Sequence, residues 1–236
     1  MAALKADQLR GVIAVVIPVR NEAAHLPLLL ADLAMAPAGL IGELLVVDGG
    51  SSDGSGRLAT LAGAALQHTG GGRGAQLVAG VAATEAPWLL LLHGDLRLPP
   101  RWWEPVLAAL GQAEAAWYFR LRVRESGLAL RLMEAAVELR SRWALTPYGD
   151  QGLLLPRGLL EQAGGLRPLP LMEDLDLVLR LRQQAPIRCL EREVRVEGRR
   201  WRRLGVWRTA WHNARLRRAW RHGTEPGELA RRYYQL

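Results

Sequence analysis

Several features that would identify common classes of protein are missing from this chain of 236 residues. Cys189 is the only cysteine, so no internal disulfide can form, which fits a reducing compartment. No apolar run approaches the ~18 residues that a membrane-spanning helix needs. Residues 1–10 carry charges and lack the apolar core of a secretory signal. We therefore expect a cytoplasmic protein without a membrane span.

Lysine is almost absent as well, because Lys5 is the only one and arginine supplies the other 30 basic residues. The formal net charge is +8, and the arginines are densest between residues 199 and 221. Such a segment favours anionic partners, namely a diphosphate, a membrane surface or nucleic acid. One predicted helical face among these arginines is apolar, as in a helix that lies at a membrane interface, and contains Leu204, Trp207, Trp211 and Ala214. The alternative is a terminal helix that packs on the core and leaves a basic face in solvent.

The hydrophobic pattern of the first half alternates between short apolar runs and amphipathic stretches. It predicts strands at residues 12–18, 43–48, 65–68, 88–93 and 115–123, and helices at 22–35, 55–61, 75–83 and 101–110. This alternation with short connections is typical of βα units. It predicts an α/β fold with a mainly parallel sheet flanked by helices.

The second half is predicted to have longer helices and fewer strands. We expect helices at 128–143 and 171–182, strands at 149–155, 187–190 and 194–196, and closing helices rich in arginine and tryptophan. No repeat or long linker interrupts the chain. We therefore interpret residues 1–236 as one domain, divided into 12–112, 113–203 and the basic C-terminal helices 204–236.

Polar residues follow three of the predicted strands directly, at the edge where an open α/β sheet binds its ligand. The three strand ends are Pro18-Val19-Arg20-Asn21-Glu22, Asp48-Gly49-Gly50-Ser51-Ser52-Asp53 and His93-Gly94-Asp95. Amides and carboxylates there can accept from ribose hydroxyls and base N–H groups. Asp95 is a suitable ligand for Mg²⁺ or Mn²⁺, and His93 suits Mn²⁺ better than Mg²⁺. The alternatives are ordinary structural roles: Asn21 as a helix cap, Asp48 as a loop former and Asp95 as a turn cap.

A glycine cluster at residues 70–74 contains Arg73 and precedes a predicted helix. Glycine amides and a guanidinium can bind a diphosphate together. No Gly-Lys-Ser/Thr follows, which excludes a P-loop, and Leu77 stands where the third glycine of a dinucleotide-binding fingerprint belongs. The alternative is a plain loop.

Three further pairs in the second half are candidates for chemistry. Glu173 and Asp174 begin a helix, where a carboxylate can act as a general base toward an acceptor hydroxyl, a role that contributes ~10²–10⁴-fold. They can equally be ordinary acidic residues of a first helical turn. Arg200 and Trp201 can stabilise a departing diphosphate and wall a sugar pocket, or belong to a solvated basic stretch. Asp150-Gln151 is the one recognisable pair in the segment where we expect acceptor contacts.

The order of these motifs resembles that of the family 2 glycosyltransferases, inverting enzymes with the GT-A fold. Residues 18–22 look like that family's Pro-x-x-Asn-Glu, 47–53 like its Val-Asp-Asp-Gly-Ser-x-Asp, and 93–95 like its Asp-x-Asp metal motif. Residues 172–174 look like its Glu-Asp base motif and 197–201 like its Gln-x-x-Arg-Trp. The likeness covers roughly residues 12–203. More narrowly, the sequences at 72–76, 92–95, 149–152 and 170–174 are similar to a small bacterial subgroup associated with arsenosugar biosynthesis and carotenoid-acid glycosylation.

The resemblance implies transfer of one sugar, with inversion, from a UDP- or GDP-linked donor to a small or lipophilic acceptor. The nucleoside would be held by Asn21, Glu22 and Asp48, with Pro18, Arg20, Gly49 and Arg73 also in the donor site. Asp95 with His93 would hold a divalent metal, Mg²⁺ or Mn²⁺. Asp174 would be the base with Glu173 beside it, and Asp150, Gln151, Arg200 and Trp201 would line the diphosphate and acceptor region.

The resemblance also implies a role for each of the three parts of the chain. Residues 12–112 would bind the nucleotide sugar and 113–203 the acceptor, while 204–236 would permit peripheral contact with the inner face of the cell membrane. We do not expect a nucleic-acid partner.

Three positions depart from the family pattern. Gly49 replaces a second aspartate and leaves the preference for UDP open, His93 replaces the first metal-motif aspartate, and Glu197 replaces a glutamine. Two other functions fit parts of the sequence. One is a nucleotidyltransferase, which would need a glycine-rich basic loop directly after the first strand. The other is a basic membrane-binding or nucleotide-binding protein without catalysis.

Overall fold

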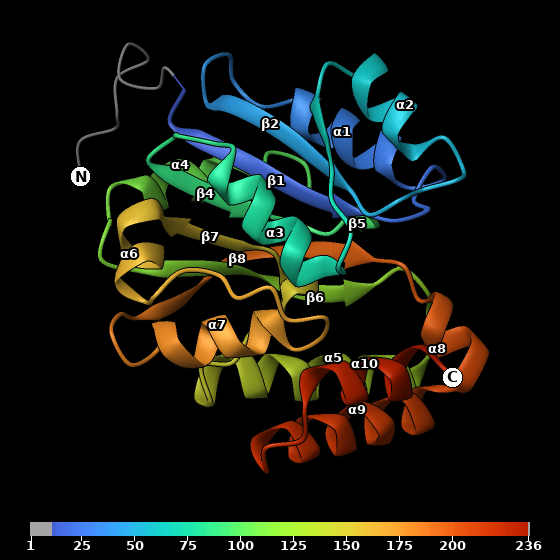
Figure 1. Cartoon of the computed structure of the whole chain (residues 1–236). Coiled ribbons are helices and arrows are strands. Elements are labelled where there is room, and N and C mark those ends of the chain that lie inside the picture. The colour runs from blue at the N-terminus through green and yellow to red at the C-terminus, as the bar shows by residue number, and fades with distance from the viewer. Residues whose placement is uncertain (1–10, 236) are drawn as a thin grey trace.

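One sheet of eight strands runs through the protein in the spatial order β3-β2-β1-β4-β7-β6-β8-β5 (Figure 1). The computed structural model describes residues 11–235. The strands are β1 (Ile13–Val19), β2 (Ile41–Asp48), β3 (Ala65–His68), β4 (Trp88–Leu91), β5 (Leu96–Arg97), β6 (Ala116–Val123), β7 (Leu153–Pro156) and β8 (Ile187–Val196). The helices are α1 (Leu26–Ala34), α2 (Ser55–Leu61), α3 (Arg73–Ala82), α4 (Trp103–Leu110), α5 (Leu128–Trp143), the 3₁₀ turn η2 (Gly149–Gln151), α6 (Arg157–Gln162), α7 (Glu173–Leu181), α8 (Arg199–Leu204), α9 (Val206–Arg221) and α10 (Pro226–Tyr234).

The first half of the chain forms the parallel part of the sheet. β1 pairs in parallel with β2 and β4, and β2 pairs in parallel with β3. All seven residues of β1 are buried, because helices cover both faces. Its odd-numbered residues from Ile13 to Ile17 share one core with α1 and α4, and Ala14 and Val16 share another with α3, α6 and α7. A strand buried on both faces is a continuous apolar run, which is the pattern that predicted it.

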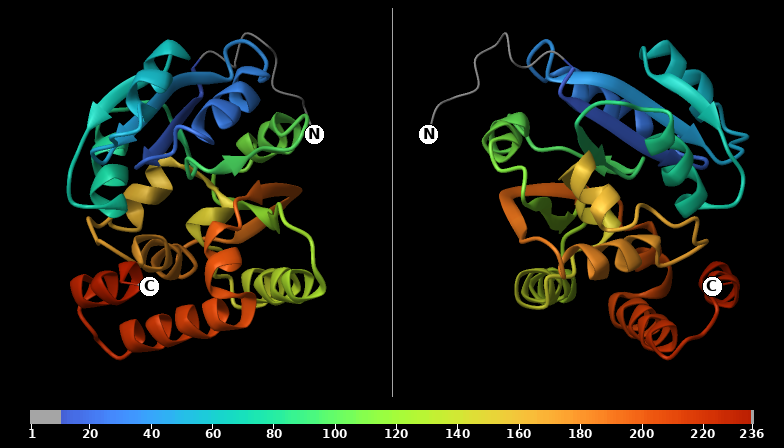
Figure 2. Two further views of the ribbon diagram at one scale, coloured as in Figure 1. Left: turned by 90° about the vertical axis from the view of Figure 1, so that its right-hand side faces the viewer. Right: turned by 60° about the vertical axis from the view of Figure 1, so that its left-hand side comes forward.

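The second half adds strands of both directions. β7 lies antiparallel between β4 and β6, and β5 lies antiparallel to β8, while β6 and β8 are parallel. The sheet is therefore mixed but mostly parallel, with helices on both faces, as predicted (Figures 1 and 2).

Several predicted elements differ from the structure. The strand expected at 149–155 is the turn η2 followed by β7, because Gly152 breaks the extended path with a φ of +65°. The strands expected at 187–190 and 194–196 are one strand, β8, and the helix expected from residue 22 begins at Leu26. β5 and α6 were not predicted, since two and six residues are too short for a periodic signal.

The helices α5, α8, α9 and α10 gather at one end of the molecule, opposite β2 and α2 (Figures 1 and 2). The apolar face predicted from Leu204 to Ala214 does not lie on one helix. Gly205, with a φ of +80°, separates Leu204 at the end of α8 from Trp207 and Trp211 on α9. Within residues 11–235, no helix has both the length and the apolar composition that crossing a bilayer requires.

Candidate functional site

The loops after β1 and β2 are tied together by the residues of the first two motifs. Asn21, at a left-handed φ of +57°, accepts the N–H of Ser52 at 2.9 Å and donates its own N–H to the Ser51 hydroxyl at 2.9 Å. The Ser55 hydroxyl accepts the N–H of Glu22 at 2.8 Å, and Asp53 accepts the N–H of Ala23 at 2.9 Å. The alternative role of Asn21 as a helix cap is wrong, because the cap of α1 is His25. Asn21 instead joins the two loops at the edge of the sheet.

Asp48 is held within its own loop. Its side chain is buried, and Oδ1 accepts the N–H and the hydroxyl of Ser51 at 2.9 and 2.6 Å. Its Oδ2 lies 3.7 Å from His68 Nδ1. These contacts fit the loop-forming role that was the alternative to nucleoside binding. Nearby, Pro18 is buried in β1, whereas Arg20 is exposed at the strand end.

Gln76 is a residue of this region that the sequence analysis missed. It lies on α3, is buried, and donates both N–H groups of its side-chain amide, to the carbonyl oxygens of Val19 at 2.9 Å and Val47 at 2.7 Å. It thereby fixes the ends of β1 and β2. A Cβ at residue 49 would lie 3.0 Å from Gln76 Nε2. Gly49, which replaces the second aspartate of the family pattern, therefore leaves room for the Gln76 amide. A polar residue on the buried face of a predicted helix was the available signal.

The loop after β4 meets the β1 loop through an arginine from α8. Arg199 lies 2.7 and 2.8 Å from the two carboxylate oxygens of Glu22 and 3.5 Å from Asp95 Oδ2. Burial raises the pKa of Glu22, and Asp95 adds to this against the opposing effect of Arg199. The sequence analysis singled out Arg200, whose side chain lies outside what the structure describes. Arg199 is thus the described arginine that faces this loop.

Arg73 forms an ion pair with Glu173, which joins the glycine cluster to the base motif. The Glu173 side chain is 0% exposed, and its Oε2 has no hydrogen-bond partner in the described structure. Burial opposes the charge on Arg73, but Glu173 and Asp174 outweigh it and raise the pKa of the guanidinium. A Cβ at Gly74 would lie 2.3 Å from the Leu169 carbonyl oxygen, so this glycine brings α3 against the segment before α7. The guanidinium that we expected at a diphosphate is therefore engaged by a carboxylate.

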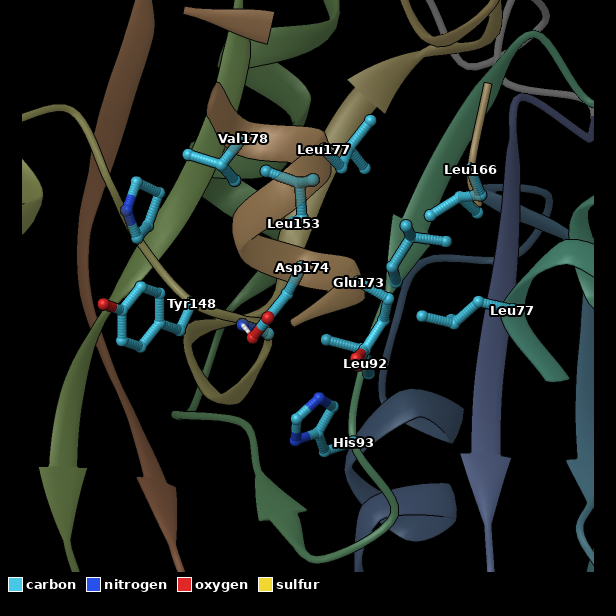
Figure 3. A pocket seen from close by; sticks show the side chains of 13 residues that line it. Leu77, Leu92, His93, Tyr148, Leu153, Leu166, Glu173, Asp174, Leu177 and Val178 are labelled. Carbon is cyan, nitrogen blue, oxygen red and sulfur yellow. Dashed lines mark hydrogen bonds between the residues drawn. The ribbon is translucent and has the colours of Figure 1, made fainter. Parts of the chain in front are cut away.

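Asp174 lies at the wall of a cavity with His93, Tyr148 and Gly149 (Figure 3). Its Oδ2 accepts the Gly149 N–H at 2.8 Å and its Oδ1 accepts the Leu175 N–H at 2.7 Å. Burial alone would raise the pKa of Asp174, but Arg73, the Gly149 N–H and His93 together lower it. The carboxylate is therefore ionised near neutral pH and can accept a proton.

His93 faces the same turn from the β4 loop. Burial, with help from Arg73, lowers the pKa of His93 to about 4, so its imidazole is neutral near pH 7. A Cβ at Gly149 would lie 2.5 Å from His93 Nε2 and 3.3 Å from Asp174 Oδ2. The absence of a side chain at residue 149 thus allows the imidazole, the η2 turn and the carboxylate to meet.

The volume of this cavity is about 30 Å³. A typical ligand pocket has ~300 Å³ or more, so the cavity marks the position of Asp174 and not a whole substrate site. A larger groove of about 620 Å³ lies between α1, β5 and β8, around Arg97, Trp103 and Arg195. None of the site residues predicted from the sequence lines that groove.

The other predicted acceptor residues differ in how they are placed. Gln151 is fully buried, accepts the Ser141 hydroxyl at 2.9 Å and donates to the Phe119 carbonyl at 3.1 Å, so it holds η2 in position. Asp150 has a buried Oδ1 without a partner, and burial raises its pKa to about 6. Trp201 is partly buried and packs against the main apolar core.

Asp95 and His93 carry donor atoms of the kinds that bind a divalent metal. Across residues 11–235, no three His, Cys, Asp or Glu side chains converge closely enough to hold a metal by themselves. Mg²⁺ in nucleotide-dependent enzymes is usually held by one or two carboxylates plus substrate phosphates, so such a cage is not needed. A carboxylate at a strand end beside a neutral imidazole fits that coordination, and the imidazole favours Mn²⁺.

Solved structures share this fold. A mannosyltransferase from Pyrobaculum calidifontis in complex with GDP-Man and Mn²⁺ is 19% identical, with a TM-score of 0.63, over 89% of this chain and 61% of that one. Glucosyl-3-phosphoglycerate synthase from Mycobacterium tuberculosis, in complex with Mn²⁺, UDP and glucosyl-3-phosphoglycerate, is 21% identical over 84% of this chain and 76% of that one, with a TM-score of 0.55. TarS 1-349 from S. aureus is 16% identical over 78% and 57%, with a TM-score of 0.60. At these identities the likeness establishes the fold, which is GT-A.

Sequence comparison assigns the family. No curated protein sequence matches the chain significantly. The family model described as glycosyl transferase family 2 matches residues 14–169, which is more than half of the chain. This match favours a glycosyltransferase over the two other functions considered from the sequence, a nucleotidyltransferase and a binding protein without catalysis. With the GT-A fold around the Asn-Glu, Asp95 and Glu-Asp motifs, the chain belongs to the family 2 glycosyltransferases.

Proposed function

We propose that this protein transfers one sugar, with inversion, from a UDP- or GDP-linked donor to a small or lipophilic acceptor, and that Asp174 is the base. The observation that carries the proposal is the ionised Asp174 carboxylate, held by two backbone N–H groups next to the His93-Gly94-Asp95 loop. Solved relatives of the same fold hold UDP or GDP-Man with Mn²⁺. The nucleotide and metal of those proteins are the donor and cofactor that we propose here.

The chemistry is a direct displacement. The acceptor hydroxyl donates a hydrogen bond to Asp174, which takes its proton as the oxygen bonds to the anomeric carbon. The bond from that carbon to the nucleotide diphosphate breaks on the opposite face, and the configuration inverts. Arg199 is placed beside Asp95 and Glu22 to offset charge on the departing diphosphate. A divalent metal held by Asp95 and His93 would supply further charge stabilisation when bound.

Donor binding can be tested by thermal unfolding with UDP and with GDP, each in Mn²⁺ and in EDTA. A ligand at ~100 times its Kd adds ~2.7 kcal/mol of stability, which such a scan resolves. We expect a metal-dependent shift with one nucleotide, lost in Asp95→Ala and kept in Glu228→Gln, a control on α10. The absence of any shift with either nucleotide would contradict the donor proposal.

The base is tested by Asp174→Asn. We expect nucleotide binding to persist while turnover falls by ~10²–10⁴-fold. An acceptor that is itself a carboxylic acid needs no base, and then the variant would lose much less. If Asp174→Asn weakened nucleotide binding as much as it lowered turnover, the result would contradict the role of a base.

Membrane contact is a further part of the proposal, supported by the exposed faces of α5 and α9. Among residues 11–235, six of the ten large apolar side chains with high exposure lie on these two helices, which contact each other: Leu128, Leu132, Leu139, Trp143, Trp207 and Trp211. On α5 they recur at a spacing that places them on one side of the helix, and Trp143 is 83% exposed. Residues 198–224 contain nine arginines and no acidic residue. Apolar side chains among arginines fit an anionic membrane surface, and with it a location at the inner face of the membrane.

Vesicle sedimentation tests this contact. Vesicles of phosphatidylglycerol and phosphatidylcholine should retain the protein at low salt, and those of phosphatidylcholine alone should retain less. Leu139→Ser with Trp143→Ser should weaken retention, whereas Leu61→Ser, equally exposed on α2 at the far end, should not. Equal retention of all three proteins would contradict the contact. The narrower link to arsenosugar or carotenoid-acid glycosylation rests on the sequences at 72–76, 92–95, 149–152 and 170–174 and is part of the same proposal.

A further inference from the structure

Two arginines without acidic partners lie against the aromatic ring next to Asp174. Tyr148 lines the cavity and lies beside Asp174, on the side away from Leu77 (Figure 3). The Arg140 guanidinium, from α5, lies 3.5 Å from the centre of the Tyr148 ring. The Arg217 guanidinium, from α9, lies 5.6 Å from the same centre. Helices that are far apart in the sequence thus bring two positive charges to the same side of the cavity.

These arginines differ from most others in the protein. Throughout the described residues, neither Arg140 nor Arg217 has a carboxylate within 4.0 Å, although both are partly buried. The Nε of Arg140 is buried without a hydrogen-bond partner, and one of its amino groups reaches Gln151 Oε1 only at 3.5 Å. By contrast, the unpaired Arg215 and Arg218 on α9 are exposed to solvent, which screens their charge.

Placing these two charges together has a cost in the free protein. Burial lowers the pKa of Arg217, and the neighbouring Arg140 and Arg221 lower it further. Asp150 is an acidic group on which Arg140 acts: Arg140 lowers the pKa of Asp150, but burial outweighs that effect, and in the described structure no ion pair within 4.0 Å joins the two. Like charges that burial brings together without a direct ion pair are stabilised by an anion that binds between them.

We propose that Arg140 and Arg217 form a binding site for an anionic group of the acceptor, a phosphate or a carboxylate, with Tyr148 as its wall. The planar guanidinium binds both groups through paired hydrogen bonds, and Arg140 is already stacked on an aromatic face. An acceptor anchored there places a nearby hydroxyl over Asp174. The proposal rests on the proposed function, because it identifies the chemical class of the acceptor. It covers a free anionic acceptor and a lipid-borne phosphate alike.

The experiment uses the full chain, saturated with its donor nucleotide and Mg²⁺ so that the diphosphate position is filled, at concentrations that keep magnesium phosphate in solution. Binding of inorganic phosphate is titrated by thermal unfolding in wild type, Arg217→Met, Arg140→Met and the control Arg218→Met. Hydrogen bonds to charged groups contribute enough that each of the first two variants should bind phosphate about tenfold more weakly. Arg218→Met should bind like wild type. A parallel arm measures retention on vesicles that contain phosphatidic acid.

A second readout separates a binding role from a structural one. Without phosphate, Arg217→Met should unfold at the same temperature as wild type or higher, because it removes one of two neighbouring charges. A structural arginine would give a lower midpoint, and that result would overturn the proposal.

The two arms identify the source of the anion. Weaker binding of soluble phosphate supports a free acceptor, and weaker retention on vesicles alone supports a lipid-borne one. Equal affinity of wild type and both variants in both arms overturns the site. The nucleotide shift is recorded first in the same samples, so that its absence contradicts the proposed function while the phosphate comparison still tests the site.

Discussion

The ion pair between Arg73 and Glu173 provides the sharpest test of how this site is stabilised. Glu173 is fully buried, and one of its oxygens has no partner even with the arginine in place. Burial raises the pKa of Glu173, against the opposing effect of Arg73. Arg73→Met keeps the length of the side chain on α3 but leaves the carboxylate without its counter-ion. The variant must then either keep a buried charge or protonate Glu173.

Protonation sets an upper limit on the cost. An unfolded glutamate has a pKa of about 4.3, and each unit is worth 1.36 kcal/mol, so protonation costs about 4 kcal/mol near pH 7.5 and about 1.6 kcal/mol near pH 5.5. Removing one partner of a buried pair typically costs about 3–5 kcal/mol. Because the Arg73 side chain is 33% exposed, we take the lower end of that range. Arg73→Met should therefore lose about 3 kcal/mol near pH 7.5 and at most half of that near pH 5.5.

The sign follows from linkage. A carboxyl whose folded pKa is raised stabilises the fold below its unfolded pKa, and that stability is lost as the pH rises through the folded pKa. Urea denaturation of wild type and Arg73→Met at both pH values measures the difference. Arg73→Met with Glu173→Gln removes the charge and should recover most of the loss near pH 7.5. A loss that was the same at both pH values, and unchanged in the double variant, would refute the electrostatic explanation in favour of lost packing.

Three further substitutions test other parts of the structure. Asp150→Asn should be more stable than wild type by up to about 3 kcal/mol near pH 7.5 but not near pH 4, because wild type loses stability as the pH rises through the Asp150 pKa of about 6. Urea denaturation in EDTA measures the difference, and the same dependence of stability on pH in both proteins would count against a buried Asp150. Gly80→Ala should cost about 1–3 kcal/mol in the same assay, since its Cβ would lie 2.4 Å from Val16 Cγ1, whereas the exposed Gly158→Ala meets nothing within 4 Å and should be neutral or stabilising. Gly149→Ala should lower turnover by at least about tenfold with little change in the unfolding midpoint, because it displaces His93 and Asp174 from each other; unchanged turnover would show that their contact is not required.

The parallel half of the fold was predictable because its strands are buried on both faces. The predicted bounds of β1 to β4 lie within two residues of the observed ones, and α2 and β3 agree at both ends. The prediction was poorer for β8, where Glu191 and Glu193 interrupt the apolar pattern. In the structure these two carboxylates pair with Arg142 and Arg122, from α5 and β6, so the strand continues through them. Partners from distant segments decide such cases, and their identity is not a property of the local sequence.

The same limit explains the choice between adjacent arginines at the start of α8. The local sequence does not distinguish Arg199 from Arg200 as the site residue, because only the rotational position of α8 decides which of the two faces Glu22. Gly198 fixes that position, since a Cβ there would lie 2.1 Å from the Glu125 carboxylate. Glu125 lies two residues after the end of β6, and its carboxylate is 3.0 Å from the Arg202 guanidinium. The orientation of α8 is thus set by a contact between residues more than seventy positions apart in the chain.

The distribution of charge around Asp174 bears on the proposal that the acceptor is anionic. Arg73 and Arg199 lie beside the donor loops, and both are engaged by carboxylates, Glu173 for the first and Glu22 with Asp95 for the second. A nucleotide diphosphate adds negative charge to that side, so neither arginine can also serve an anionic acceptor. Arg140 and Arg217 come from α5 and α9 and lie against Tyr148, which is beside Asp174 on the side away from Leu77 (Figure 3). If the acceptor is anionic, these two arginines balance its charge without competing with the donor for Arg73 or Arg199, and the ionised Asp174 remains free to take the proton.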